Sequence, residues 1–214
     1  MKNLLYKELR LCMPVQAWIY FLLIITVVVP NWPPIIGFYM PLVACNIIFP
    51  LALANRDFLY SQLLPIAKKD IVKGKFLLIL FIEVLSLLIG GLLLIPRYFF
   101  IQPYFKFLMG ADFGVIGVAL LMYGLFNIVF LPWLFAKPEK PIWSILVSCL
   151  LSAVVFGAYI GVCGALPEVA RLINSFAPGD IWIQLSMAGV GVILFAVLTV
   201  LAYTLATRNY LRSE

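Results

Sequence analysis

Glu83 is the only ionisable residue that lies deep inside one of the long apolar stretches of this sequence. A charge near the centre of a bilayer costs roughly 2.5–3.5 kcal/mol. A carboxyl group there is therefore expected to be protonated, paired or in contact with a water-filled cavity. Two interpretations stay open: a residue that lines or couples a transport pathway, and a hydrogen bond between helices or subunits. A proton relay would normally use more than one such group.

Histidine is absent from the 214 residues, which excludes Ser-His nucleophiles and histidine-ligated metal sites. The four cysteines form no C-x-x-C pair and lie in or beside apolar stretches, so we expect buried reduced thiols. They are Cys12, Cys45, Cys149 and Cys163.

A phosphate-binding loop is also missing from the sequence. Gly74-Lys75 lacks the upstream glycine of that motif and is followed by Phe76. We therefore expect no catalytic residue, no cofactor site and no metal site in this chain. If it performs work, the energy comes from another subunit.

The composition places these residues in a membrane. Hydrophobic residues make up 65% of the chain and charged residues 11%, against about 45–50% and about 25% in soluble domains. The values exclude a soluble globular domain, a disordered chain and a disulfide-rich module. They predict an all-α integral membrane protein, whose net charge of +6 reflects basic cytoplasmic loops and not a nucleic-acid partner.

Six stretches are apolar enough to cross the bilayer, since a span needs roughly 20 apolar residues. We predict one six-helix domain over residues 1–214, because no linker or clear internal repeat divides the chain. The predicted spans are Val15–Val29, Ile35–Ala54, Phe76–Ile95, Gly114–Phe135, Ile142–Leu166 and Ile183–Thr207.

The basic residues predict the orientation of the spans. Twelve of the fifteen lie in segments on the same side as the two termini, and only Arg97, Lys106 and Arg171 lie on the other side. By the positive-inside rule, both termini are predicted to be cytoplasmic. The basic, apolar start is not followed by a small-x-small cleavage site, so we expect Met1–Val29 to be retained.

Two segments outside the spans have an amphipathic pattern. Met1–Met13 places apolar residues at helical spacing, with Lys7 and Glu8 on the opposite polar face, and predicts an interfacial helix that ends at Pro14. The alternative is a frayed basic tail. Pro167–Phe176 predicts a short external helix, and the aromatic segment Arg97–Phe113 is expected to lie against the outer leaflet.

The segment Asn55–Lys75 is long for a loop in so small a protein. Asp57 is a candidate N-cap for a short helix over Phe58–Leu64, which Pro65 ends. A second helix is expected to begin near Ala67 and to continue through the third span, so that this span projects into the cytoplasm. The segment fits a docking element for a partner, or equally an element that only touches lipid headgroups.

Small and polar residues inside the spans predict contacts between helices. Gly157 and Gly161 form a G-x-x-x-G pair that permits close helix packing, within the chain or within a dimer. Asn127 and Gln184 are expected to make hydrogen bonds between helices.

This layout resembles the permease subunits of type-2 ABC exporters. The resemblance rests on NLLYKELRL near the start and on FLYSQLLPIAKKDIVKGKFL, residues 58–77, where such permeases often have a Leu-Pro-hydrophobic-small-basic run that leads to Ile-Val-x-Gly-Lys. Ala67 and Lys68 depart from the family, which more often has Ser or Thr and often Arg at these positions.

The resemblance implies that the loop after the second span docks on a separate ATP-binding-cassette ATPase, which holds the ATP and Mg²⁺. A second permease copy or a paralogue would complete the pathway in a bacterial cell membrane. The size and the few internal charges resemble exporters of amphipathic peptides such as phenol-soluble modulins; antibiotics and lipids would suit the same apolar wall. The residues to which the resemblance assigns ATPase coupling are Asp57, Phe58, Leu59, Leu63, Leu64, Pro65, Lys68, Lys69 and Asp70.

Two other classes of membrane protein remain as alternatives. The first is the substrate-binding subunit of an energy-coupling-factor importer, although Val15–Val29 lacks the Ala-x-x-x-Ala surface usual in its first helix. The second is a non-transporting assembly factor or immunity protein. Importer subunits also depend on an ATPase, so high-affinity vitamin binding by the isolated chain is the observation that would favour them. A non-transporting protein would show no nucleotide-dependent conformational change with any partner.

Overall fold

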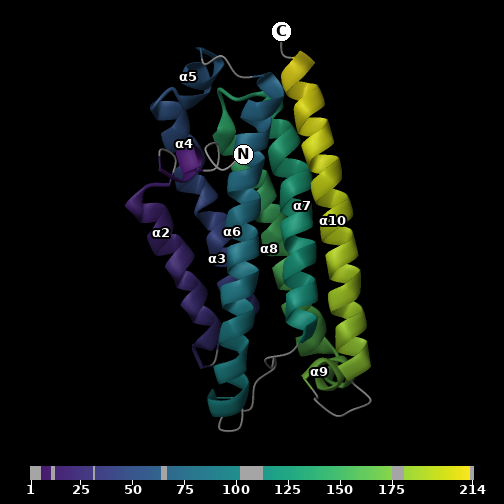
Figure 1. Ribbon diagram of the computed structural model, residues 1–214. Helices are drawn as coiled ribbons and strands as arrows, with labels where there is room; N and C mark the ends of the chain where they lie inside the picture. The colour runs from purple at the N-terminus through teal and green to yellow at the C-terminus, as the bar shows by residue number, and fades with distance from the viewer. Residues whose placement is uncertain are drawn as a thin grey trace.

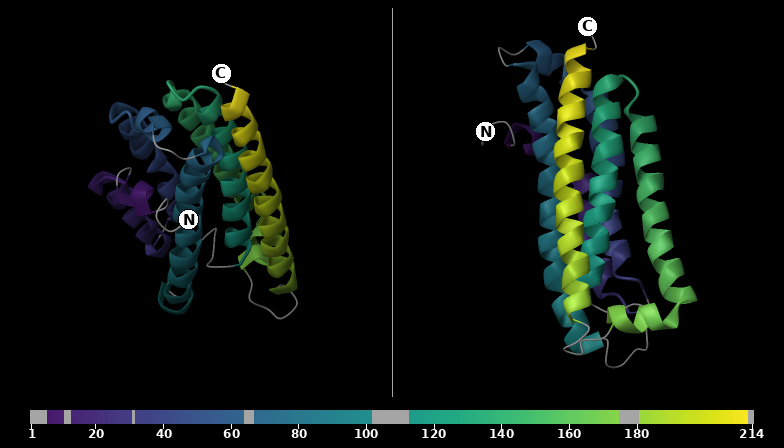
Figure 2. Two further views of the ribbon diagram at one scale, coloured as in Figure 1. Left: turned by 45° about the horizontal axis from the view of Figure 1, so that its top comes forward. Right: turned by 90° about the vertical axis from the view of Figure 1, so that its right-hand side faces the viewer.

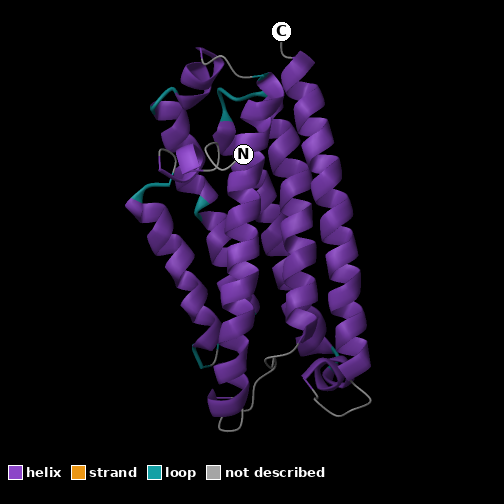
Figure 3. Ribbon diagram, in the orientation of Figure 1, coloured by secondary structure: helices purple, strands orange, loops and turns teal. Residues whose placement is uncertain are grey.

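The computed structural model describes residues 6–10, 13–30, 32–63, 67–101, 113–174 and 181–212. Within these ranges the regular secondary structure is entirely helical (Figure 3). Five helical stretches are long and apolar enough to cross a membrane. The chain is therefore an all-α membrane protein, as its composition predicts.

The long helices lie side by side in one bundle (Figure 1). Each begins or ends within a few residues of the predicted span, and those of the third and sixth spans extend well beyond it. The bounds are α3 Ile35–Val43 with α4 Cys45–Ala54, α6 Lys68–Pro96, α7 Phe113–Ala136, α8 Pro141–Ala165 and α10 Ile181–Arg212.

The first predicted span is shorter than the others. It consists of α2, Val15–Leu22, followed by the 3₁₀ helix η1, Leu23–Val28. With rises of about 1.5 Å per α-helical residue and about 2.0 Å per 3₁₀ residue, the pair is about 24 Å long. The 3₁₀ geometry lengthens the segment, but it remains short of the roughly 30 Å hydrocarbon core.

The second span is interrupted at Ala44, between α3 and α4. Pro41 and Pro50 lie inside the two helices, and each removes one backbone donor. The neighbouring α7 is bonded to this span by a side chain, since the Tyr123 hydroxyl donates to the Phe38 carbonyl at 2.8 Å. The packing of α7 thus stabilises a span that its own sequence weakens.

The third span continues into the loop before it, as the sequence predicts. α6 begins at Lys68, ends at Pro96 and passes into a single π turn, η2, Arg97–Ile101. Its 29 residues extend about 44 Å, more than the hydrocarbon core requires.

The connecting elements gather at two opposite ends of the bundle. α5, Asp57–Leu63, lies at the end where α6 begins and where α7 and α10 finish (Figures 1 and 2). α9, Pro167–Asn174, lies at the opposite end and is the short amphipathic helix predicted from residue 167. We refer to these as the α5 end and the α9 end. The prediction of orientation compared the basic residues of the connecting segments on the two sides of the spans. The described segments lie at the two ends in the same grouping.

Two glycines allow α7 and α10 to approach closely. A Cβ atom at Gly117 would lie 2.5 Å from the Met187 carbonyl oxygen, and one at Gly191 would lie 2.5 Å from the Gly117 carbonyl oxygen. Both positions face backbone, which cannot move aside as a side chain can. This close contact between α7 and α10 is therefore made by glycines that no motif singled out.

Replacing Gly117 with alanine is expected to lower the free energy of unfolding by about 1–3 kcal/mol, because the added methyl group forces α7 and α10 apart. Gly189→Ala on α10 is the matched control, since its Cβ would have no neighbour within 4 Å. Denaturant titration in mixed micelles measures both variants. Equal stability of the two would show that the helices are not held at this separation.

The predicted G-x-x-x-G pair does not pack within this chain. Gly157 and Gly161 are exposed on α8, and a Cβ at either would meet no other atom within 4 Å. Among the described residues this pair therefore has no packing partner. Packing between two copies remains a prediction.

Candidate functional site

A buried cluster of charged residues lies at the α5 end and connects three elements. The helical residues 6–10 contribute Lys7 and Glu8, α5 contributes Asp57, and α6 contributes Lys75. Glu8, Asp57 and Lys75 are 3%, 7% and 0% exposed. Three segments that are distant in sequence thus meet through side chains that rarely enter a protein interior unpaired.

Lys75 is at the centre of the cluster. Its ammonium group donates to Glu8 Oε2 at 2.6 Å and to Asp57 Oδ2. Both bonds are charge-assisted and therefore among the stronger hydrogen bonds in proteins. Lys75 has no access to water, so these carboxylates replace the solvation that its charge has lost.

Lys7 attaches the N-terminal segment to one face of α5. Its ammonium group lies 3.2 Å from Asp57 Oδ1, donates to Ser61 Oγ at 2.7 Å and lies 5.9 Å from the centre of the Tyr60 ring. Residues 57, 60 and 61 share a face because helical neighbours lie three and four positions apart. α5 is thereby fixed in orientation as well as in position.

The cluster is electrically balanced, with two lysines and two carboxylates. Burial alone would raise the pKa of the Asp57 carboxyl, but Lys75 and Lys7 together hold that pKa below its ordinary value. Asp57 is therefore ionised at neutral pH. Its contribution to stability is present above the ordinary aspartate pKa and is lost as the pH falls through the lowered value.

The burial of Glu8 corrects one prediction. The sequence pattern placed Lys7 and Glu8 on the water-exposed face of the N-terminal helix, whereas Glu8 is 3% exposed. The helix therefore presents a polar edge to the protein as well as an apolar face. The pattern missed this because the partner that buries Glu8 is Lys75, which lies 67 positions away in sequence.

The outer side of α5 is open. Leu63 is 84% exposed at the end of the helix, and Tyr60 is 54% exposed. A cavity of about 380 Å³ lies beside the helix and is lined by Ala52, Asn55, Asp57 and Tyr60. α5 is thus anchored on one side and free to contact a partner on another.

The other predicted coupling residues have different placements. Lys68, Lys69 and Asp70 form the first turn of α6, with Lys69 exposed. Phe58 and Leu59 belong to α5, but their side chains lie outside the described residues, as do Leu64 and Pro65 entirely.

Glu83 makes a hydrogen bond between helices, which was one of its two predicted roles. Asn127 Nδ2 on α7 donates to Glu83 Oε2 at 3.0 Å and lies 3.2 Å from Thr199 Oγ1 on α10. All three side chains are buried. The group joins α6, α7 and α10, so the expectation that Asn127 connects helices is also confirmed.

A second buried cation, Arg97, was not found by sequence reasoning, which counted it only as an external charge. It is 1% exposed, and its guanidinium donates to the carbonyls of Val27 at 2.6 Å, Val29 at 3.2 Å and Trp32 at 2.9 Å. These carbonyls lie in the last turn of η1 and in the loop after it, where helical partners run out. Arg97 therefore joins the first span to the end of α6.

The cysteines match the expectation drawn from their surroundings. Cys45, Cys149 and Cys163 are buried free thiols, and Cys12 lies outside the described residues. Among the described residues no group of three or more cysteines and carboxylates is arranged to hold a metal ion.

Comparison with known families agrees with this architecture. Residues 3–211 match the model of the ABC-2 family transporter proteins, which covers nearly the whole chain. The chain belongs to this family, whose members are generally membrane subunits that work with a separate ATPase. No curated protein and no solved structure matches it. It is thus a multi-pass ABC-type permease subunit.

Proposed function

We propose that the chain is one permease of an ATP-driven exporter and that α5 is its coupling helix. In this proposal the chain crosses the membrane six times, with the α5 end and both termini in the cytoplasm. The ATP and Mg²⁺ belong to the partner ATPase, and a second permease copy or a paralogue completes the pathway. Hydrolysis would move the pair between inward-facing and outward-facing states.

The observation that carries the proposal is the buried cluster that fixes α5 to the N-terminal segment and to α6. A helix that only touched lipid headgroups would need no buried ion pairs on its inner face. α6 leads from this cluster to Arg97, about 33 Å further along the axis, where the loop after the first span is attached. A displacement of α5 would therefore be carried to the far side of the membrane.

The cargo in this proposal is amphipathic or hydrophobic, such as a peptide, an antibiotic or a lipid. The membrane-spanning part holds Glu83 as its one deeply buried acid, and that acid already has a hydrogen bond from Asn127. Little charge is left to bind a strongly polar solute. Amphipathic peptides of the phenol-soluble modulin type fit this apolar wall.

Leu63→Asp is expected to reduce recovery of the ATPase at least tenfold when the tagged permease is purified in mild detergent. Leu63 is highly exposed, so the change introduces a charge on the docking surface with little effect on folding. Leu64→Asp extends the test to the next residue. Quantitative mass spectrometry of the co-purified subunits measures the result.

Leu211→Asp is the matched control, because it adds the same charge to an exposed leucine at the α5 end but on α10. It should leave ATPase recovery unchanged. If both Leu63→Asp and Leu64→Asp retain a stoichiometric ATPase, α5 is not the coupling helix. If the wild type binds no ATPase in nanodiscs, the non-transporting class is favoured; vitamin binding by the isolated chain would favour the importer subunit.

A further inference from the structure

One face of α10 is exposed along the helix and changes from apolar to cationic near the α5 end. It carries Val197, Leu201, Leu205, Arg208 and Arg212, all of them exposed. Successive members are three or four positions apart, which places them on a single stripe. We call these five residues the α10 stripe.

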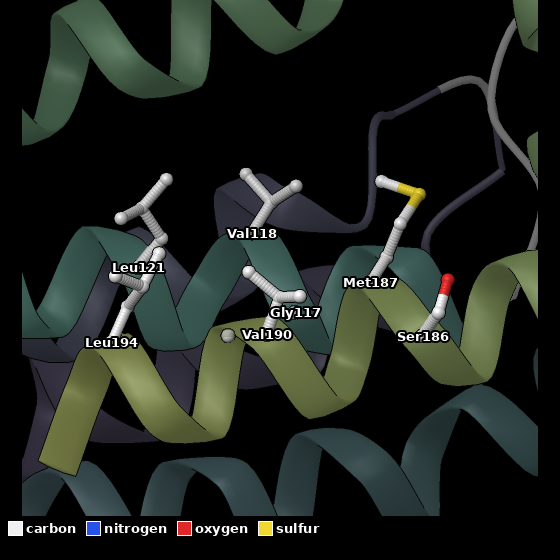
Figure 4. Close-up of a pocket in the computed structure, with 8 residues that line it drawn as sticks. Gly117, Val118, Leu121, Ser186, Met187, Val190 and Leu194 are labelled. Carbon is white, nitrogen blue, oxygen red and sulfur yellow. The ribbon is translucent and has the colours of Figure 1, made fainter.

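The residues of the α10 stripe are not the ones through which α10 packs against α7. α10 contacts α7 through other positions, including Gly191 and the buried Thr199, Ala202 and Ala206. The stripe continues toward the α9 end in Val190 and Leu194, which line an apolar groove of about 260 Å³ between α7 and α10 (Figure 4). No described part of the chain covers this surface.

The cations of the stripe have no acidic partner among the described residues. Arg208 and Arg212 occur in none of the ion pairs of that part of the chain. The Asn209 amide beside them donates to the Pro132 carbonyl at 2.9 Å and attaches this end of α10 to the last turn of α7. Lys137 and Lys140 follow that turn and add two more exposed cations.

The dimensions of the stripe match one leaflet of a bilayer. Val197 and Arg208 are 11 positions apart, or about 16 Å along the helix, which is close to half of a roughly 30 Å hydrocarbon core. Trp133, on the last turns of α7, is partly exposed near the same boundary, where tryptophan is favoured. The apolar part therefore has the depth of acyl chains, and the arginines lie at headgroup level.

We propose that the α10 stripe binds an anionic phospholipid, with its acyl chains on Val197, Leu201 and Leu205 and its phosphate on Arg208 and Arg212. Arginine binds phosphate in a bidentate manner, and a headgroup with net negative charge offsets part of the charge of the two side chains, which a zwitterionic headgroup does not. The site requires only that this surface faces lipid. It is independent of the ATPase and of the direction of transport.

Native mass spectrometry of the detergent-purified chain with added phosphatidylglycerol or phosphatidylcholine tests the proposal. Wild-type protein is expected to retain phosphatidylglycerol preferentially. Removing both charges with Arg208→Gln and Arg212→Gln should weaken its binding roughly thirtyfold, since each basic residue near an anionic surface contributes about fivefold. Arg208→Lys with Arg212→Lys should keep most of the preference over phosphatidylcholine.

The control removes two charges elsewhere at the same end, with Arg10→Gln and Lys73→Gln on residues 6–10 and α6. These changes should leave phosphatidylglycerol binding within about twofold of wild type. An equal loss in the control would show diffuse attraction in place of a site. Unchanged binding in the glutamine variant would also overturn the proposal. The two arginines would then be candidates for contact with a protein partner.

Discussion

Replacing Lys75 with methionine is expected to lower the free energy of unfolding by about 3–5 kcal/mol, the usual cost of breaking a buried ion pair by removing one partner. Methionine has a similar length, so little packing is lost. Of the two lysines of the cluster, Glu8 and Asp57 would keep Lys7, whose side chain is 21% exposed. Denaturant titration in mixed micelles measures the change.

The matched control for this prediction is Lys73→Met, two positions earlier on the same helix. Lys73 is half-buried and is in no ion pair of the described residues, so its loss should change stability by less than about 0.5 kcal/mol. A double-mutant cycle with Glu8→Gln adds a second readout. Purely additive effects of Lys75→Met and Glu8→Gln would contradict a direct interaction between these side chains.

Replacing Arg97 with methionine is expected to cost on the order of 3–4 kcal/mol, because three carbonyl groups lose a charged donor in a buried position. The effect should be local as well as global. Hydrogen exchange of residues 23–34 should accelerate, since η1 and the loop after it lose their attachment to α6. Arg97→Lys should retain part of the protection because one ammonium group reaches fewer of the three carbonyls.

Arg171→Met on α9 is the control for Arg97, as it removes an arginine at the same end of the bundle. Arg171 is 76% exposed in its side chain, and within the described residues its ion pair is with the exposed Glu168 at 3.6 Å. Exposed pairs of this kind contribute little. If Arg171→Met and Arg97→Met had the same effect on residues 23–34, the attachment through Arg97 would be excluded.

The helices themselves could be predicted from local sequence. The length of each apolar stretch predicted the position of each long helix. The starts of α9 and α6, at Pro167 and Lys68, also agree with the predicted starts. The basic residues indicated which connecting segments lie at the same end. These signals are local because a span must satisfy its backbone internally and bury no charge. The resemblance in residues 58–77 was confirmed by the match to the ABC-2 family.

The contacts between the helices could be predicted only in part. Asn127 was expected to connect helices, but its partners Glu83 and Thr199 lie 44 and 72 positions away. The G-x-x-x-G motif pointed to α8, whereas Gly117 and Gly191 are the glycines at which α7 and α10 bring backbone against backbone. A short motif shows only that a helix face permits close packing. The arrangement of all the helices decides which face meets a neighbour.

The sequence by itself determined that this protein is a helical membrane protein of the ABC type, because apolar length, basic loops and a coupling-like loop are properties of single segments. Only the tertiary structure decided which charges are functional candidates. In sequence, Lys75 and Arg97 are two more basic residues at the ends of a span. In the fold they are buried, because each meets acceptors from segments distant in sequence that replace water.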